Sequence, residues 1–175
     1  MSEAGTPLDG QLGQRDGRWQ LRFQRRLPYP PAKVWRALTE PEHLAAWFPF
    51  AIEGERVSGA PLRFVAPDGA GPAIEGQMLA CEPPALLEFR WGDGETLRFE
   101  LQPDGAGCLL TLINTIEQVG KAARDAAGWH TCLDVLALHL DGQASPWAPR
   151  ERWSQVHPTY VRRFPAEAST IGPPA

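Results

Sequence analysis

Residues 27–48 read LPYPPAKVWRALTEPEHLAAWF, and this stretch decides the fold class. The Pro30–Pro31 pair favours the start of a helix, because the first helical turn does not need the backbone N–H that proline lacks. Apolar residues then follow at helical spacing, and Thr39 can cap a second short helix that starts near Pro41. A strand followed by two short helices is how a helix-grip fold begins, in which a curved sheet wraps around one long helix.

Strand patterns flank this stretch on both sides. In residues 18–27, Trp19 and Phe23 fall on one face and polar side chains fall on the other, which predicts a half-buried strand. Between residues 51 and 116, short alternating segments are separated by turn signals such as Gly92-Asp93-Gly94. We therefore expect an antiparallel meander of about six or seven strands.

The pattern changes to that of a long helix over residues 121–140. Trp129, Leu133 and Leu136 recur at helical spacing, so they form one stripe that can pack on the sheet. Gly142 then ends the helix, since glycine is favoured just after a helix C-terminus. The order of elements predicts an α+β domain with a helix-grip fold.

The composition divides the chain into three segments. Residues 1–16 are polar and glycine-rich and are expected to be disordered. Residues 17–142 are expected to form the helix-grip domain. Residues 143–175 are expected to be a partly helical extension that packs on the domain or on a partner. The apolar side chains that argue against a free linker there are Trp147, Trp153, Tyr160 and Phe164.

Charge and cysteine usage argue against several classes of protein. The formal net charge of -4 and the pI of about 5.6 argue against nucleic-acid binding, which usually needs a basic field. Cys81, Cys108 and Cys132 are widely spaced, so we expect neither a disulfide framework nor a zinc site. The sequence shows no signal-peptide or membrane-span pattern, which predicts a cytoplasmic protein. Scattered histidines predict no metal site, and without a phosphate-binding glycine loop no cofactor is expected.

Two motifs resemble the signatures of one known family. Residues 28–48 carry PxPPxKVWRALTxPxxLxxWF, and residues 128–142 carry GWHxCLDxLxxxLxG. They resemble the opening and the final helix of proteins similar to the C-terminal domain of the activator of heat-shock protein 90 ATPase. The likeness spans residues 19–142 and implies a START-like (SRPBCC) protein, in the superfamily of polyketide cyclases and birch-pollen-allergen-like proteins. That superfamily includes ligand carriers, cyclases, hydrolase-like enzymes and chaperone activators, and its fold often encloses a cavity between the sheet and the last helix.

The inward positions of the strands and of the long helix define a candidate ligand cavity. Bulky walls with a few polar groups are typical of small-molecule sites. The predicted lining residues are Trp19, Phe23, Trp47, Phe48, Phe89, Trp91, Phe99, Leu112, Asn114, Trp129, Leu133 and Leu136. The alternative is that these side chains fill the core. The exposed-looking Trp47–Phe48 pair either gates the cavity mouth or plugs the space between helix and sheet.

Two polar positions stand out among the apolar ones. Asn114 lies at an inward position of an apolar strand, and a buried amide without a partner costs about 1–3 kcal/mol. It binds a ligand, bonds to His130 or Arg25, or lies near solvent at the strand end. His130 precedes Asp134 by one helical turn, which indicates either a carboxylate-oriented base or an ion pair on the helix surface. No residue is assigned as catalytic.

The combined pattern favours a non-enzymatic protein that binds a small hydrophobic or amphipathic molecule. One alternative is an enzyme of the polyketide cyclase or hydrolase type that acts on a bound aromatic substrate through His130 or Asn114. That alternative requires His130 to face the cavity. The other alternative is a chaperone-associated stress-response protein. A second copy of the chain, forming a homodimer, is also left open as a partner.

Overall fold

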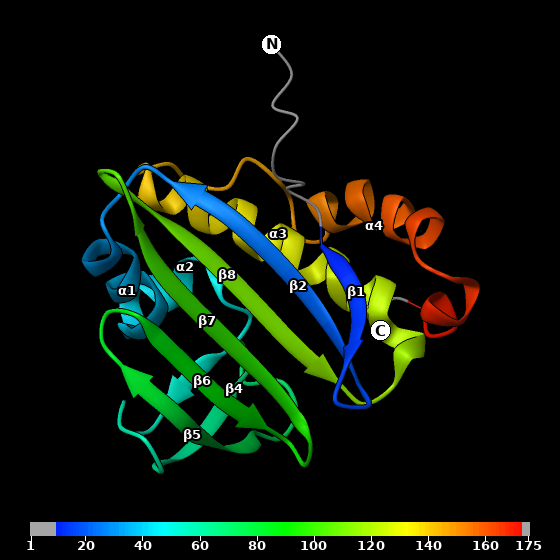
Figure 1. Ribbon diagram of the computed structural model, residues 1–175, viewed down its shortest axis with the longest axis horizontal. Helices are drawn as coiled ribbons and strands as arrows, with labels where there is room; N and C mark the ends of the chain where they lie inside the picture. Colours follow the sequence, from blue (N-terminus) through cyan, green and yellow to red (C-terminus); the bar gives the residue numbers. More distant parts are fainter. Residues whose placement is uncertain (1–9, 173–175) are drawn as a thin grey trace.

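The computed structural model describes residues 10–172 and shows an eight-stranded antiparallel sheet with helices packed against one face (Figure 1). The strands are β1 (Gln11–Arg15), β2 (Arg18–Leu27), β3 (Ala51–Glu53), β4 (Pro61–Val65), β5 (Ile74–Glu82), β6 (Leu86–Trp91), β7 (Glu95–Asp104) and β8 (Gly107–Ile116). Their order in the sheet is β1-β2-β8-β7-β6-β5-β4-β3. The pairing of β2 with β8 therefore joins the N-terminal hairpin to a meander of the other strands.

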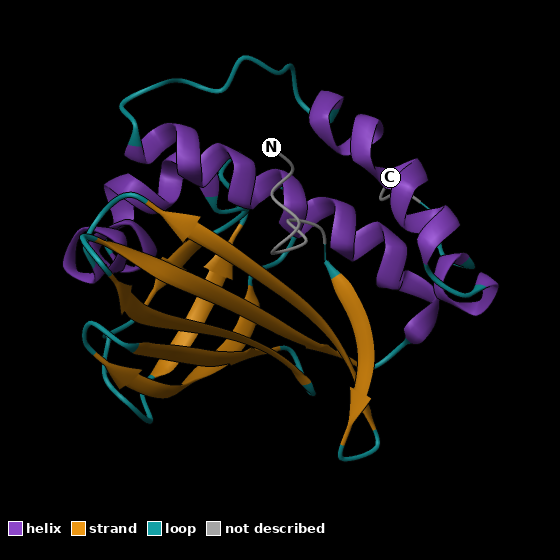
Figure 2. Cartoon of the chain, turned by 45° about the horizontal axis from the view of Figure 1, so that its top comes forward, coloured by secondary structure: helices purple, strands orange, loops and turns teal. Residues whose placement is uncertain are grey.

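The helices form two layers over the sheet (Figure 2). They are α1 (Pro31–Thr39), α2 (Pro41–Trp47), α3 (Ala122–Leu140) and α4 (Glu151–Arg163), with short 3-10 turns η1 (Val119–Lys121) and η2 (Ala166–Ser169). Helix α3 lies across the sheet, and α4 lies on the side of α3 away from it. The predicted α+β helix-grip class is confirmed. Within residues 10–172, no helix is long and apolar enough to cross a membrane.

Strand β1 corrects the sequence analysis, which expects about six or seven strands and a disordered segment over residues 1–16. Residues 11–15 of that segment pair antiparallel with β2 through a turn at Asp16 and Gly17, whose φ angles are 53° and 77°. An Asp-Gly pair is favoured in the type I′ turns of two-residue hairpins. Because β1 is mostly exposed, its polar composition is like that of a disordered segment. Residues 1–9 lie outside the described residues.

The core lies between the sheet and α3. Phe23 of β2 and Leu97 and Phe99 of β7 are each no more than 2% exposed. Leu133 and Leu136 of α3 are buried to the same extent. Full burial of one such side chain stabilises the fold by about 1.5–3 kcal/mol, so this interface provides much of the stability.

The described part of the C-terminal extension packs back on the domain. Tyr160 of α4 is fully buried, and Val156 and Phe164 are nearly so. Farther along, the backbone N–H of Ile171 donates a hydrogen bond to the carbonyl oxygen of Gly120 at 3.0 Å. The extension therefore covers the outer face of α3.

Candidate functional site

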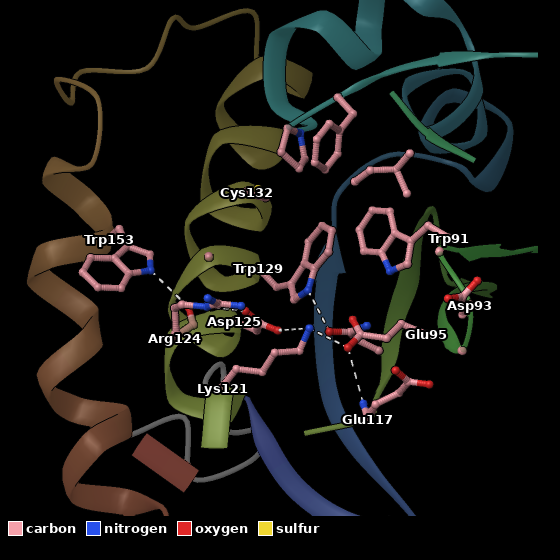
Figure 3. A pocket seen from close by; sticks show the side chains of 17 residues that line it. Trp91, Asp93, Glu95, Glu117, Lys121, Arg124, Asp125, Trp129, Cys132 and Trp153 are labelled. Atoms are coloured by element: carbon pink, nitrogen blue, oxygen red, sulfur yellow. Dashed lines mark hydrogen bonds and ion pairs between the residues drawn. The ribbon is translucent and has the colours of Figure 1, made fainter. Parts of the chain in front are cut away.

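A pocket of about 630 Å³, called the main pocket below, opens between α3, the β6–β7 turn and the end of β8. Figure 3 shows its side chains converging from the helix and from the strands. Small-molecule sites typically enclose about 300–1,000 Å³, so this volume is sufficient for a ligand. The lining residues are Pro49, Phe50, Ile74, Trp91, Gly92, Asp93, Gly94, Glu95, Asn114, Glu117, Lys121, Arg124, Asp125, Gly128, Trp129, Cys132 and Trp153.

One face of α3 forms the helical wall of the main pocket. Asp125, Gly128 and Cys132 of α3 line it, together with Lys121, which directly precedes the helix, and their spacing places all four on one side. A Cβ at Gly128 would meet no neighbouring heavy atom within 4 Å. Glycine inside a helix costs about 1 kcal/mol relative to alanine. Here it leaves open space above the helix.

Aromatic rings form the apolar wall. The rings of Trp91 and Trp129 are stacked, with centroids 5.6 Å apart and planes inclined by 21°. Phe50 meets Trp91 edge to face at a centroid distance of 5.9 Å. Such offset and edge-on pairs are the favourable arrangements of aromatic rings. They offer a rigid surface on which a further flat ring can pack.

Asn114 holds Trp129 in place. It is the third residue from the end of β8, it lies opposite Leu21 of β2 and Leu97 of β7, and it is 1% exposed. Its Oδ1 accepts a hydrogen bond from the indole Nε1 of Trp129 at 3.1 Å, and its Nδ2 donates to the carbonyl oxygen of Thr96 at 3.1 Å. Of the alternatives that the sequence left open, a hydrogen bond to His130 or Arg25 is therefore wrong, and so is a position near solvent.

A charged network lies at the mouth of the pocket. Lys121 Nζ lies 2.5 Å from Glu95 Oε2 and 3.6 Å from Asp125 Oδ2, and Arg124 Nε lies 3.0 Å from Asp125 Oδ1. Burial raises the pKa of Asp125, and the nearby charges of Lys121 and Arg124 partly oppose that rise. The network joins the start of β7 to the start of α3 (Figure 3).

The C-terminal extension contributes Trp153 to the pocket. This residue lies on α4, and its indole Nε1 donates a hydrogen bond to the carbonyl oxygen of Arg124 at 3.1 Å. Its ring stacks on His157, with centroids 4.3 Å apart. Trp153 therefore both joins α4 to α3 and completes the wall of the pocket.

The predicted cavity residues divide into two groups. Trp91, Asn114 and Trp129 line the main pocket. Most of the others are buried in the core, and Trp19 is partly buried against it. Alternation along a strand identifies its inward face but not where sheet and helix separate, so the sequence analysis did not distinguish lining from core. The predicted residues outside the lining are Trp19, Phe23, Trp47, Phe48, Phe89, Phe99, Leu112, Leu133 and Leu136.

The Trp47–Phe48 pair fills the space between helix and sheet. Both side chains are 5% exposed, so the expectation of an exposed pair is wrong. The indole Nε1 of Trp47 donates to the carbonyl oxygen of Ala37 at 2.8 Å, and the ring of Phe48 lies 5.8 Å from that of Trp129. Phe48 thus packs against both rings of the aromatic wall.

His130 lies in a second cavity, called the α4 cavity below, between α3 and α4. This cavity has a volume of about 260 Å³ and is lined by Arg25, His130, Asp134, Arg152, Val156, Thr159 and Tyr160. His130 Nδ1 lies 2.7 Å from the hydroxyl of Tyr160, and its Nε2 lies 3.5 Å from Asp134 Oδ2. His130 is buried and does not line the main pocket, so it is neither on the helix surface nor at the position that the enzyme hypothesis requires.

Cys132 is the thiol of the main pocket. Burial raises its pKa to about 12. The thiolate, not the thiol, is the nucleophile and metal ligand. Cys132 is therefore a thiol and not a thiolate at neutral pH.

A group of potential metal ligands lies on α2, away from the main pocket. Glu40, Glu42 and His43 each place one ligand atom within 4.8 Å of the others. His43 Nδ1 also lies 2.8 Å from His139 Nε2 of α3. The histidines are scattered in the sequence, but the fold brings two of them, His43 and His139, together.

The charged and helical parts of the main pocket were not predicted from the sequence. Glu95 and Glu117 lie at strand ends, and Lys121 and Asp125 lie at the start of a helix. Their position at the ends of elements could have identified them, because an antiparallel meander brings alternate strand ends to the same end of the sheet. Trp153 carries no such signal, since its segment is separated from the domain in sequence.

A curved antiparallel sheet that grips one long helix, with a cavity at their interface, defines the START-like class. Residues 28–141 match the model of the family described as Activator of Hsp90 ATPase homolog 1-like protein. The chain belongs to this family. The match confirms the resemblance carried by the two motifs.

Solved structures of similar proteins share the fold. CalU16 from Micromonospora echinospora aligns with a TM-score of 0.71 at 23% identity, over 88% of this chain and 96% of that chain. A Bordetella parapertussis protein, encoded by gene BPP1335, aligns with a TM-score of 0.67 at 29% identity, over 94% and 95% of the two chains. DynU16, a protein in the dynemicin biosynthetic locus, aligns with a TM-score of 0.63 at 26% identity, over 73% of this chain and 49% of that chain. No curated protein matches the sequence.

Proposed function

We propose that this protein binds a small apolar or amphipathic molecule in the main pocket. The observation that carries the proposal is a cavity of about 630 Å³ with the stacked pair Trp91 and Trp129 in its wall. Burial of apolar surface provides about 25 cal/mol per Å² before the cost of ordering the ligand. Asn114, which keeps one lone pair and one N–H beyond its two protein hydrogen bonds, is placed to orient a polar group of the ligand.

The chemistry of the lining residues favours binding over catalysis. The thiol of Cys132 is protonated at neutral pH, and the Lys121 and Arg124 cations are engaged by carboxylates. His130 faces the hydroxyl of Tyr160 in the α4 cavity instead of the main pocket. A nucleophile paired with a base, which covalent catalysis needs, is not found among the described residues that line the pocket.

A cyclase-type enzyme is the second candidate, supported by the likeness to DynU16, a protein in a biosynthetic locus. In that case Asn114 is the polar group nearest the aromatic wall. The chaperone-partner prediction rests on the family alone. The homodimer prediction rests on apolar residues of the extension, of which Tyr160 and Phe164 pack within this chain instead.

Filling the pocket tests the proposal. In Gly128→Leu the new side chain extends into open space, whereas Gly128→Ala adds only a methyl group. The neutral fluorescent probe N-phenyl-1-naphthylamine, titrated into each protein, measures occupancy. We expect wild type and Gly128→Ala to bind with similar affinity. We expect Gly128→Leu to bind at least about tenfold more weakly, a loss of roughly 1.4 kcal/mol.

Thermal unfolding of the same three proteins serves as the control. Gly128→Ala is expected to be more stable by about 0.5–1 kcal/mol, because alanine is the better helix former. Gly128→Leu should unfold no earlier than wild type. Equal probe affinity in wild type and in a folded Gly128→Leu would show that the main pocket is not the binding site.

A further inference from the structure

The ionisable residues that line the main pocket carry more negative than positive charge. Four carry carboxylates and two carry cations, a formal charge of −2 around one opening. The carboxylates are those of Asp93, Glu95, Glu117 and Asp125, and the cations are those of Lys121 and Arg124. Charge of one sign in a cleft with low-dielectric walls focuses the field and selects ligands of the opposite sign.

Both cations are engaged within the protein. Lys121 lies between Glu95 and Asp125 at 2.5 and 3.6 Å, and Arg124 contacts Asp125 at 3.0 Å. The side chains of Lys121 and Arg124 are only 18% and 24% exposed, so water screens these pairs weakly. An anionic ligand group would have to compete with carboxylates that are already in place. The two cations therefore do not form an anion site.

Asp93 and Glu117 provide the surplus negative charge. No cation of residues 10–172 lies within 4 Å of either carboxylate. Asp93 lies in the turn between β6 and β7, and Glu117 follows β8. In Figure 3 both lie on the strand side of the pocket, below Trp91. A ligand seated against the aromatic wall therefore has, on its strand side, two carboxylates without an ion-pair partner among the described residues, where the guanidinium groups of Arg90 and Arg18 donate instead to the carbonyl oxygens of Gly92 and Gly94.

The aromatic wall also favours a positively charged ligand. The face of an indole or phenyl ring carries negative electrostatic potential and attracts ammonium groups within about 6 Å of its centroid. The main pocket presents Trp91, Trp129, Phe50 and Trp153. The aromatic lining and the surplus carboxylates are thus two separate features that favour a cation.

We infer that the ligand of the main pocket is an amphipathic cation, a flat aromatic molecule that carries a protonated amine or a quaternary ammonium group. The inference rests on the proposed function, because it specifies the ligand class of the same pocket. The ring system packs on Trp91 and Trp129, and the positive group lies at the mouth near Asp93 and Glu117. Fatty acids and other anionic amphiphiles are disfavoured by the same arrangement.

A series of naphthalenes that differ only in charge tests the inference. The probes are 2-naphthylmethylammonium, 2-naphthylmethanol and 2-naphthoate, titrated by calorimetry at about pH 7 and low ionic strength. We expect the ammonium compound to bind about tenfold more tightly than the carboxylate, with the alcohol between them. In the variant Asp93→Asn/Glu117→Gln, the preference for the ammonium compound over the carboxylate should fall to about threefold or less.

A matched control separates local charge from total charge. Asp68→Asn/Glu82→Gln removes two exposed carboxylates outside the pocket and changes the net charge by the same amount. It should keep the preference of wild type. Loss of the preference in this control as well would assign it to the whole-protein field and overturn the inference.

The remaining outcomes distinguish the inference from the proposed function. If the carboxylate binds as tightly as the ammonium compound, or more tightly, the inference about the charge of the ligand is overturned. The proposal that the main pocket binds a small molecule remains valid. The inference alone also fails if N-phenyl-1-naphthylamine binds and the ammonium compound does not. If neither that probe nor any of the three naphthalenes binds, both are overturned.

Discussion

Helix α3 supplies a wall to two cavities, and its two faces hold their neighbours by different interactions. On the sheet side, the main pocket is formed by stacked rings, and its charges lie at the mouth. On the α4 side, the smaller cavity is crossed by Asp134, which contacts Arg25 Nη1 at 2.7 Å and Arg152 Nε at 2.9 Å. The comparison shows that one helix can combine an apolar site on one face with a polar, ion-paired joint on the other.

Because the two cavities are held by different interactions, they should respond differently to substitution. Apolar contacts are non-directional, so the main pocket can exchange contents without losing stability. A buried ion pair depends on every partner, because removing one leaves the other charge uncompensated. Changes at the α4 cavity should therefore affect stability, and changes at the main pocket should affect binding.

The largest expected effect is the loss of Asp134. In Asp134→Ala, the Arg25 and Arg152 guanidinium groups lose the carboxylate they share, and we expect a loss of about 3 kcal/mol in the free energy of unfolding. Urea denaturation measures it. The matched control is Asp104→Ala, which breaks an exposed pair with Arg26 and should cost less than about 1 kcal/mol. Equal costs for the two variants would remove the contrast between the two faces of α3.

A smaller effect is expected at Asn114, where the main pocket itself contains a buried polar group. Asn114→Leu leaves the Trp129 indole N–H and the Thr96 carbonyl without their partner, at a cost of about 1–3 kcal/mol. Probe affinity should fall as well, because Trp129 is no longer held. Combining Asn114→Leu with Trp129→Phe should cost less than the sum of the single changes, measured by urea denaturation. Additive costs would show that the hydrogen bond does not couple them.

The smallest effect is a pH dependence at the mouth of the main pocket. Burial raises the pKa of Asp125 above its ordinary value of 3.8, so the folded state holds this proton more tightly than the unfolded state. The free energy of unfolding therefore increases as the pH falls through the folded pKa, and the gain is complete below the unfolded pKa. Asp125→Asn cannot titrate, so the stability of wild type relative to this variant should rise on acidification. A constant difference across that range would contradict the burial of Asp125.

Local sequence signals predicted much of the fold. The double proline before α1 and the turn residues between strands specify conformations that do not depend on the rest of the chain. β1 was missed because none of its side chains is buried, which leaves only the Asp16-Gly17 pair as a signal. Segments that add little to the core are the hardest to recognise by hydrophobic pattern.

The site was only partly predictable, for a different reason. Trp91, Asn114 and Trp129 were found because alternation places them on the inward face. Glu95, Lys121 and Asp125 meet only after three separate elements converge at one end of the sheet. The pattern of residues along the chain does not encode how close these elements come to one another. Whether an inward side chain borders space or another side chain is a property of the assembled packing.

The position of Trp153 bears on how ligand preference can diverge among related proteins. The family match ends at residue 141, yet Trp153 supplies part of the pocket wall from beyond that point. Variation in this segment can reshape the binding surface while the sheet and its gripped helix stay unchanged. Two family members with the same pair of motifs can then hold different molecules, and comparison of the family region alone would not reveal it.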